Sequence, residues 1–229
     1  MKTLIMMADS RPLSDDYNTY AALLNKRYAD LNGYDFLYII TMGNKRHPSW
    51  YKVKALNHCR SLGYDKVIYI DSDCFFKNSV GYEQYFTKEL TIQGDKIDMS
   101  KSFIFLNDKP WSYNLPCAGF IIMNNNDTTL SFLESWYSLG NYYRNSLWNH
   151  SWEQGILQHR MKHWSGEIEI VDDWQFREKK DQLIRHIGGQ EGFDRRGLIL
   201  SEFNQVKSDF KDFNTDIKTI QTIILNISD

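Results

Sequence analysis

The stretch Val67-Ile68-Tyr69-Ile70-Asp71-Ser72-Asp73 (VIYIDSD) is an apolar run that ends in two carboxylates separated by one residue. The apolar residues predict a buried strand, and in open α/β sheets ligands bind at the carboxyl ends of strands. In an extended segment residues i and i+2 point the same way, so Asp71 and Asp73 can converge on one cation. Such oxygen ligands suit Mg²⁺ or Mn²⁺, which also bind phosphate oxygens. The alternative is a strand that simply ends in a polar turn.

The residues before this stretch alternate between apolar strands and amphipathic helices. Apolar runs at Thr3–Ala8 and Phe36–Ile40 predict strands, and helical spacing over Tyr17–Leu31 and over 48–62 predicts helices. Strands that are continuously apolar indicate a parallel sheet covered on both faces. We therefore expect an α/β fold, with a mostly parallel sheet, that opens as β-α-β-α-β.

The second half of the chain is less regular. Strands are expected at Ser102–Leu106, Gly119–Met123, Glu167–Val171 and Leu183–Ile187. Helices are expected at about 127–139, capped by Asp127, and at about 151–164, while residues from about 201 onward predict amphipathic helices only. This pattern indicates one domain over 1–200, with halves at 1–75 and 76–200, and a helical tail at 201–229 packed on that domain.

Composition excludes several classes of protein. The 229 residues carry 27 Lys and Arg against 29 Asp and Glu, a net charge of −2, which argues against wrapping nucleic acid. With 15% aromatic residues the chain is not expected to be disordered. Its three cysteines form no C-x-x-C pair, and no stretch approaches the ~20 apolar residues of a membrane span. The first apolar run is too short for a signal peptide, so we expect a soluble cytoplasmic protein.

Two further segments hold polar residues on faces that are otherwise apolar. Lys52 shares a helical arc with Leu56, and a buried lysine needs a partner, unless it only extends its ammonium group to solvent. Glu153, beside Gln154, shares an arc with Ile156, so it is either a helix cap or an acid in a cleft.

A third segment places His186 at the end of a short apolar run, before a glycine-rich loop that includes Gly189. Such a histidine could ligate a metal while backbone N–H groups approach a phosphate, or it could be a core histidine before a turn. The glycine-rich dinucleotide and P-loop motifs are both missing from the sequence.

Taken together, these segments resemble glycosyltransferases of the GT-A fold that use nucleotide sugars. The resemblance is closest to the retaining families that include glycogenin-like enzymes, galactosyltransferases and xylosyltransferases, and it covers about residues 3–197. Their W-x-K, D-x-D, N-[AT]-G-x, D-[DE]-Q and H-x-x-G-x-x-K motifs are matched, in order, by 50–52, 71–73, 117–120, 152–154 and 186–192. Two departures from the motifs matter: Cys117 replaces Asn, and Gly192 replaces the final Lys, whose diphosphate contact Arg195 or Arg196 could supply.

The resemblance implies roles for these residues. Asp71, Asp73 and His186 would hold Mn²⁺ or Mg²⁺ on the diphosphate, and Glu153 and Gln154 would lie beside the anomeric carbon as the catalytic residues. The implied donor-binding residues, including a nucleotide cradle at the end of the first strand, are Ala8, Asp9, Arg11, Lys52, Ser72, Ala118, Gly119 and Gly189.

The resemblance also implies a reaction. A sugar would pass from a nucleotide diphosphate sugar, most often a UDP-sugar, to a carbohydrate or glycoconjugate acceptor with retention of configuration. Tryptophans in loops suit stacking against an acceptor sugar. These are Trp111, Trp148, Trp152 and Trp174.

Two other classes of function stay open from the sequence. A phosphohydrolase of the haloacid dehalogenase type also places D-x-D after an apolar strand, with Asp71 as nucleophile, Asp73 as acid and base, and 172–173 as a later acidic pair. That motif usually follows the first strand, whereas Asp71 follows the third. The other class is a non-catalytic module that binds carbohydrate or nucleotide.

Overall fold

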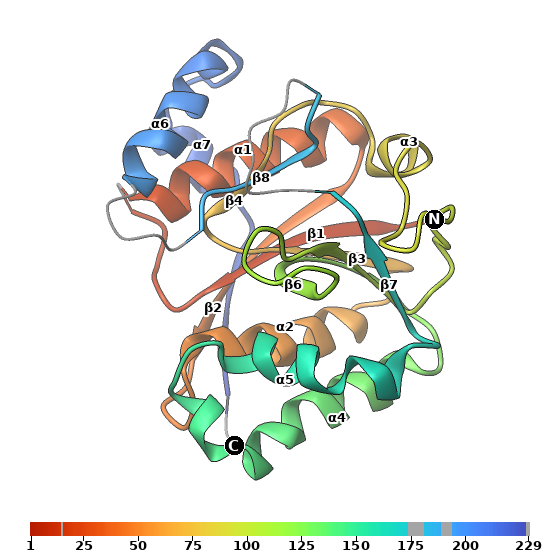
Figure 1. The fold of residues 1–229 in the computed structure, drawn as a ribbon. Coiled ribbons are helices and arrows are strands. Elements are labelled where there is room, and N and C mark those ends of the chain that lie inside the picture. Colours follow the sequence, from red (N-terminus) through yellow and green to blue (C-terminus); the bar gives the residue numbers. More distant parts are fainter. Residues whose placement is uncertain (15, 174–180, 189–193, 228–229) are drawn as a thin grey trace.

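Seven strands form one sheet in the spatial order β7-β5-β6-β3-β1-β2-β9 (Figure 1). Their bounds are β1 Thr3–Asp9, β2 Asp35–Met42, β3 Lys66–Ile70, β5 Phe103–Asn107, β6 Pro116–Asn124, β7 Ile168–Val171 and β9 Thr222–Asn226. Only β6 runs against the others in this sheet, because it pairs antiparallel with both β3 and β5. This computed structural model describes residues 1–14, 16–173, 181–188 and 194–227. The predicted α/β class with a mostly parallel sheet is confirmed.

Helices cover both faces of the sheet (Figure 1). One face carries α1 (Tyr17–Asn32), α6 (Arg195–Gln205) and α7 (Phe213–Thr219), with the short α3 (Tyr82–Phe86) nearby; the other carries α2 (Tyr51–Arg60), α4 (Thr129–Tyr142) and α5 (Trp152–Arg160). Short 3₁₀ turns occur at Pro48–Trp50, Arg144–Leu147, Met161–Trp164 and Lys207–Asp209.

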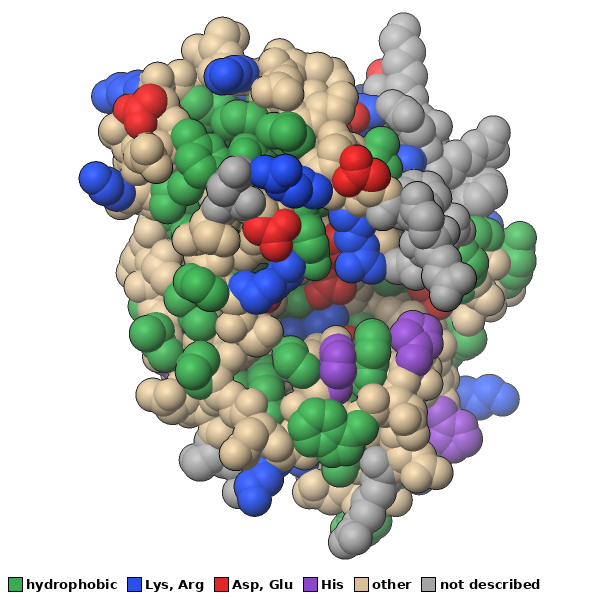
Figure 2. Space-filling model, turned by 90° about the vertical axis from the view of Figure 1, so that its left-hand side faces the viewer, with side chains coloured by type: hydrophobic (Ala, Val, Ile, Leu, Met, Phe, Trp, Pro, Cys, Tyr) green, Lys and Arg blue, Asp and Glu red, His purple; other side chains and the backbone are tan. Residues whose placement is uncertain are grey.

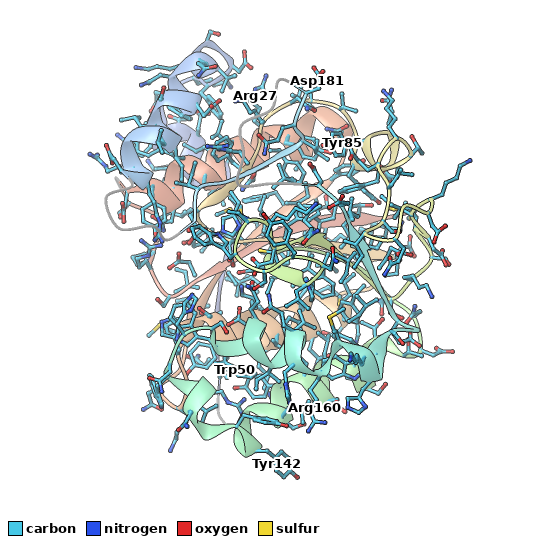
Figure 3. All side chains as sticks on the ribbon, in the orientation of Figure 1. Arg27, Trp50, Tyr85, Tyr142, Arg160 and Asp181 are labelled. Atoms are coloured by element: carbon cyan, nitrogen blue, oxygen red, sulfur yellow. The ribbon has the colours of Figure 1, made fainter. Side chains whose placement is uncertain are left out.

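The core explains why the first strands read as unbroken apolar runs. In β1, Leu4 and Met6 pack into the core on the side of α2, whereas Ile5 and Met7 pack into the core on the side of α1. A parallel strand covered on both faces needs apolar residues at every position. Trp50, labelled in Figure 3, lies at the entrance to α2 and is fully buried. Its ring centroid is 6.2 Å from that of Tyr137 in α4.

The structure also contains a second sheet of two strands, of which the sequence predicted only one. The predicted strand near residue 184 is β8 (Ile184–His186), and it pairs antiparallel with β4 (Cys74–Phe76), which the sequence did not indicate. This pairing sets Cys74 opposite His186 and therefore brings the histidine beside the D-x-D segment.

Three details correct the expectations from sequence. The tail contains the end of α6, all of α7 and also β9, which pairs parallel with β2 and extends the sheet, so a purely helical tail was wrong. The helix expected from Asp127 starts at Thr129, after Thr128, whose side chain does not cap the helix by a hydrogen bond, and it ends at Tyr142. The strand expected at Gly119 already begins at Pro116. Among the helices described, none has the length and apolarity needed to cross a membrane.

Candidate active site

A cavity of about 650 Å³ opens where β3 ends. Figure 2 shows this hollow, with acidic and basic side chains within and around it and histidines beside it. It is lined by Ser49, Lys52, Asp71, Asp73, Asp108, Trp111, Ser112, His150, Ser151, Trp152, Glu153, Gln154, Gln158, His186, Gly188 and Arg195. Residues from four of the five predicted motif segments thus line one cavity, and the segment 117–120 is not among the lining residues.

Lys52 links two acidic residues in this cavity. Its Nζ lies 2.9 Å from Asp71 Oδ1 and 2.9 Å from Glu153 Oε1, and it donates to the Ala118 carbonyl at 3.1 Å. The side chain of Lys52 is 5% exposed. Burial opposes its charge, but Asp71 and Glu153 keep the pKa of Lys52 above its ordinary value. The lysine on the buried helical face has therefore met carboxylates, one of the two outcomes considered from sequence.

Glu153 is an acid in the cleft. Its side chain is 4% exposed, and burial raises its pKa although Lys52 opposes that effect. Its backbone carbonyl accepts a hydrogen bond of 2.9 Å from Trp136 Nε1, which fixes the start of α5. The second oxygen, Oε2, is buried and has no hydrogen-bond partner in the described part of the chain. A buried carboxylate oxygen of this kind is available to a ligand in the cavity.

Asp73 and His186 form a second charged group. Asp73 Oδ1 lies 3.2 Å from His186 Nε2, and Asp73 Oδ2 lies 3.5 Å from Arg195 Nε. Burial opposes ionisation, but His186 and Arg195 lower the pKa of Asp73 to about 2. Arg195, one of the two residues considered in place of the motif lysine, thus lies beside the D-x-D segment, and its contact with a diphosphate stays a prediction.

Gly119 lies beside two of the three residues that were predicted to hold a metal, Asp71 and His186. A Cβ atom built on Gly119 would lie 2.4 Å from His186 Cε1 and 3.2 Å from Asp71 Oδ2, so a larger residue would collide with His186 and crowd Asp71. Asp71 is held by Lys52 and by a hydrogen bond from the Tyr69 hydroxyl. Asp73 in turn contacts His186, so two carboxylates and an imidazole line the same cavity, and donor atoms of these types fit a divalent cation.

Asp108 is a site residue that sequence reasoning missed. It is buried, and its Oδ2 accepts hydrogen bonds from Gln154 Nε2 at 3.1 Å and Gln158 Nε2 at 3.0 Å. Gln154 in turn accepts from the Ala118 backbone N–H at 2.8 Å. Burial raises the pKa of Asp108. Its sequence signal is the same as that of Asp71, because it is an acid that directly follows an apolar strand, β5.

The residues predicted to cradle a nucleotide lie together but do not line this cavity. Arg11 Nη2 lies 2.6 Å from Asp9 Oδ2 and 3.3 Å from Ser72 Oγ. The Arg11 guanidinium also lies 4.4 Å from the ring centroid of Tyr17. Ala8, at the same end of β1, is partly buried. This group follows β1 and adjoins the D-x-D segment through Ser72.

The predicted tryptophans are divided by the structure. Trp111 and Trp152 line the cavity, whereas Trp148 does not and is 57% exposed. Trp174 and Gly189 lie outside the described residues. The ring of Trp152 stacks on His47 at 3.9 Å with an interplanar angle of 3°, and His150 meets it edge-on at 4.9 Å. Neither histidine was singled out from sequence.

Comparisons with known proteins agree with this architecture. Residues 41–222 match a family model described as nucleotide-diphospho-sugar transferase. A glycosyltransferase involved in the glycosylation of the major capsid of PBCV-1 has a similar structure, with 14% sequence identity and a TM-score of 0.66 over 91% of this chain and 100% of that one. The glycosyltransferase GlyE of Streptococcus pneumoniae TIGR4 is also similar, with 13% identity and a TM-score of 0.59.

The match to GlyE covers 95% of this chain but only 62% of GlyE, so this chain spans less than two thirds of that protein. At these identities the two structures show a shared fold alone. No curated protein matches the sequence. The predicted resemblance to nucleotide-sugar glycosyltransferases and the predicted fold are confirmed.

Proposed function

Because the chain belongs to the nucleotide-diphospho-sugar transferase family, we propose that it moves a hexose or pentose from a UDP-sugar to a carbohydrate or glycoconjugate acceptor. We further propose that the transfer needs a divalent metal ion and retains the configuration of the sugar. The observation that carries the proposal is one cavity in which Asp71, Asp73 and His186 converge and to which Glu153 also contributes. Membership in this family favours a transferase over a phosphohydrolase or a non-catalytic binding module.

Asp71, Asp73 and His186 would hold the metal, Mn²⁺ or Mg²⁺. The fit is supported by their donor atoms and by Gly119, where any side chain would intrude on two of the three ligands. Lys52 and the Tyr69 hydroxyl orient the Asp71 carboxylate from behind. When bound, such a cation stabilises negative charge on a departing diphosphate as a Lewis acid.

Local cations suit an anionic donor. Arg195 contributes to the cavity wall, and Arg11 lies beside Ser72, the middle residue of the D-x-D segment. Both arginines have carboxylate partners in this structure, so a diphosphate would compete with Asp73 and Asp9 for them. We propose that Ala8, Asp9 and Arg11 bind the nucleoside, whereas Ala118 and Gly119 approach the sugar.

Glu153 is proposed as the residue that steadies positive charge at the reacting sugar carbon. A carboxylate fixed in a site that excludes water stabilises developing charge more strongly than one in solvent. Its Oε2 is buried without a hydrogen-bond partner among the described residues, while Lys52 holds Oε1 in place. Gln154 is fixed by Ala118 and Asp108 beside it, and we propose that it positions the donor sugar.

The test is a transfer assay with a panel of nucleotide sugars, Mn²⁺ and carbohydrate acceptors, read by mass spectrometry. Asp71→Asn and Asp73→Asn should reduce transfer to background while circular dichroism shows a retained fold. Asp65→Asn, at the opposite end of β3, is the matched control and should remain active. Full transfer by either D-x-D variant would contradict the assignment. NMR of the product anomer decides whether configuration is retained.

A further inference from the structure

Asp73, Cys74 and His186 bring three kinds of ligand atom together at the cavity wall. A carboxylate oxygen, a thiol sulfur and an imidazole nitrogen from these residues all lie within 4.8 Å of one another. The pairing of β4 with β8 sets Cys74 opposite His186, and the Ile187 N–H donates to the Asp73 carbonyl at 3.0 Å. The backbone therefore fixes the relative positions of all three side chains.

The thiol changes what this cluster can bind. Mn²⁺ and Mg²⁺ prefer oxygen ligands, whereas a set of sulfur, nitrogen and oxygen suits Zn²⁺ and related thiophilic cations. Cys74 is fully buried, while Asp73 and His186 line the cavity, so the sulfur lies behind two residues that a cation can reach from solvent. A second sulfur, Cys117 Sγ, lies 3.9 Å from His186 Nδ1.

We propose that Asp73, Cys74 and His186 form a binding site for a thiophilic divalent cation of the Zn²⁺ and Cd²⁺ class. On binding, the sulfur of Cys74 bonds the cation and the thiol proton leaves to solvent. Asp73 and His186 also belong to the ligand set proposed above for Mn²⁺ or Mg²⁺, whose third member is Asp71. The two metals therefore exclude each other, and a thiophilic cation inhibits transfer; this last clause rests on the proposed function.

The experiment titrates the substrate-free protein with Cd²⁺ and follows the ultraviolet charge-transfer absorbance of a cadmium–thiolate bond. The wild-type protein should show a band that saturates with a single cation per chain. Cys74→Ser and Cys74→Ala should lose it, and the alanine variant adds no polar group to the core. Cys59→Ser is the matched control, because Cys59 is a buried free cysteine in α2, and it should keep the band.

Several results would overturn the proposal. They are a wild-type protein without the band, a band that survives in both Cys74 variants, or a band that disappears in Cys117→Ser but not at Cys74. Circular dichroism of each variant separates lost binding from lost folding. Mutual exclusion is tested by adding Cd²⁺ to protein loaded with Mn²⁺, where the paramagnetic resonance signal of free Mn²⁺ should rise.

The Cd²⁺ absorbance and the Mn²⁺ signal can both be measured without any sugar transfer. If no nucleotide sugar is turned over but the Cd²⁺ band behaves as expected, the proposed function fails and the cation site stands. If transfer is observed and Cd²⁺ neither forms the band nor releases Mn²⁺, the cation site fails and the proposed function stands.

Discussion

Lys52 is the residue on which the two acidic parts of the cavity depend. Replacing it by Met keeps the length of the side chain but leaves Asp71 and Glu153 facing each other without the cation between them. Removing one partner of a buried ion pair costs about 3–5 kcal/mol, because the remaining charge is uncompensated. Lys52→Met should therefore lower the free energy of unfolding, measured by urea denaturation, by about this amount.

Lys54→Met is the matched control for that measurement. It lies on the same helix, only partly buried, with its Nζ 4.3 Å from the ring centroid of Tyr137, and it should cost under about 1 kcal/mol. The double variant Lys52→Met/Glu153→Gln should recover part of the lost unfolding free energy, because one of the two negative charges that face each other is gone. If Lys52→Met and Lys54→Met had the same unfolding free energy, the ion pairs of Lys52 with Asp71 and Glu153 would not stabilise the fold.

Gly119 makes a sharper test of the metal ligands. The methyl group of Gly119→Ala would fall 2.4 Å from His186 Cε1, so the imidazole must move. Displacing a ligand from its position typically weakens metal binding by about 10–100-fold. We expect this loss of Mn²⁺ affinity, measured by paramagnetic resonance, and a parallel loss of transfer.

Gly166→Ala is the comparison for Gly119→Ala, because a Cβ at Gly166 meets no atom within 4 Å. It should bind Mn²⁺ as the wild type does. If Gly119→Ala also binds Mn²⁺ normally, His186 is not a ligand of the metal, and the proposed set must be revised.

At the scale of single residues, the sequence predicted some site residues and missed others for a physical reason. Asp71, Asp73 and Lys52 belong to local patterns, an acid pair after a strand and a lysine on an apolar helical arc. Asp108 also follows an apolar strand, but as a single acid without the paired spacing of Asp71 and Asp73. Its partner Gln154, like the partner Trp152 of His47, is distant in sequence, so no local pattern encodes these contacts. Their roles depend on how loops fold back over the ends of the strands.

At the scale of elements, length and periodicity decided what could be predicted. The strands β1, β2 and β3 are unbroken apolar runs between helices, and each was expected within two residues of its observed bounds. β4 has only three residues, too few for a periodic signal. β9 contains a short apolar run, from Ile223 to Leu225, in a polar tail that was predicted to form amphipathic helices.

The alternation in β9 gives a prediction about the sheet edge. Ile223 and Leu225 pack against the core, whereas Ile224 between them is 65% exposed. Ile223→Ala should cost about 1–2 kcal/mol of unfolding free energy, since truncating a half-buried side chain removes part of the usual packing term. Ile224→Ala is the matched control and should stay within about 0.5 kcal/mol. The reverse order of the two would place the strand in the other register.

At the scale of the whole molecule, charge and binding fit together. A net charge of −2 provides no general attraction for an anionic donor, so binding must rest on local cations in and beside the cavity and on the proposed metal. The cavity is bordered by α5 on one side and by the D-x-D segment and β8 on the other. A ligand that contacts both sides would tie together parts of the chain far apart in sequence.

Ligand binding should therefore raise the thermal stability of the whole protein, and only with metal present. A nucleotide sugar at about 100 times its dissociation constant stabilises the folded state by about 2.7 kcal/mol. For a chain of this size that corresponds to a rise in Tm of about 5–10 °C, measured by thermal shift with Mn²⁺. EDTA or Asp73→Asn should abolish the rise, whereas Asp65→Asn should preserve it. A donor that raises Tm equally in EDTA would show that the protein binds nucleotide sugars without metal, and the proposed roles of Asp71, Asp73 and His186 would have to be abandoned.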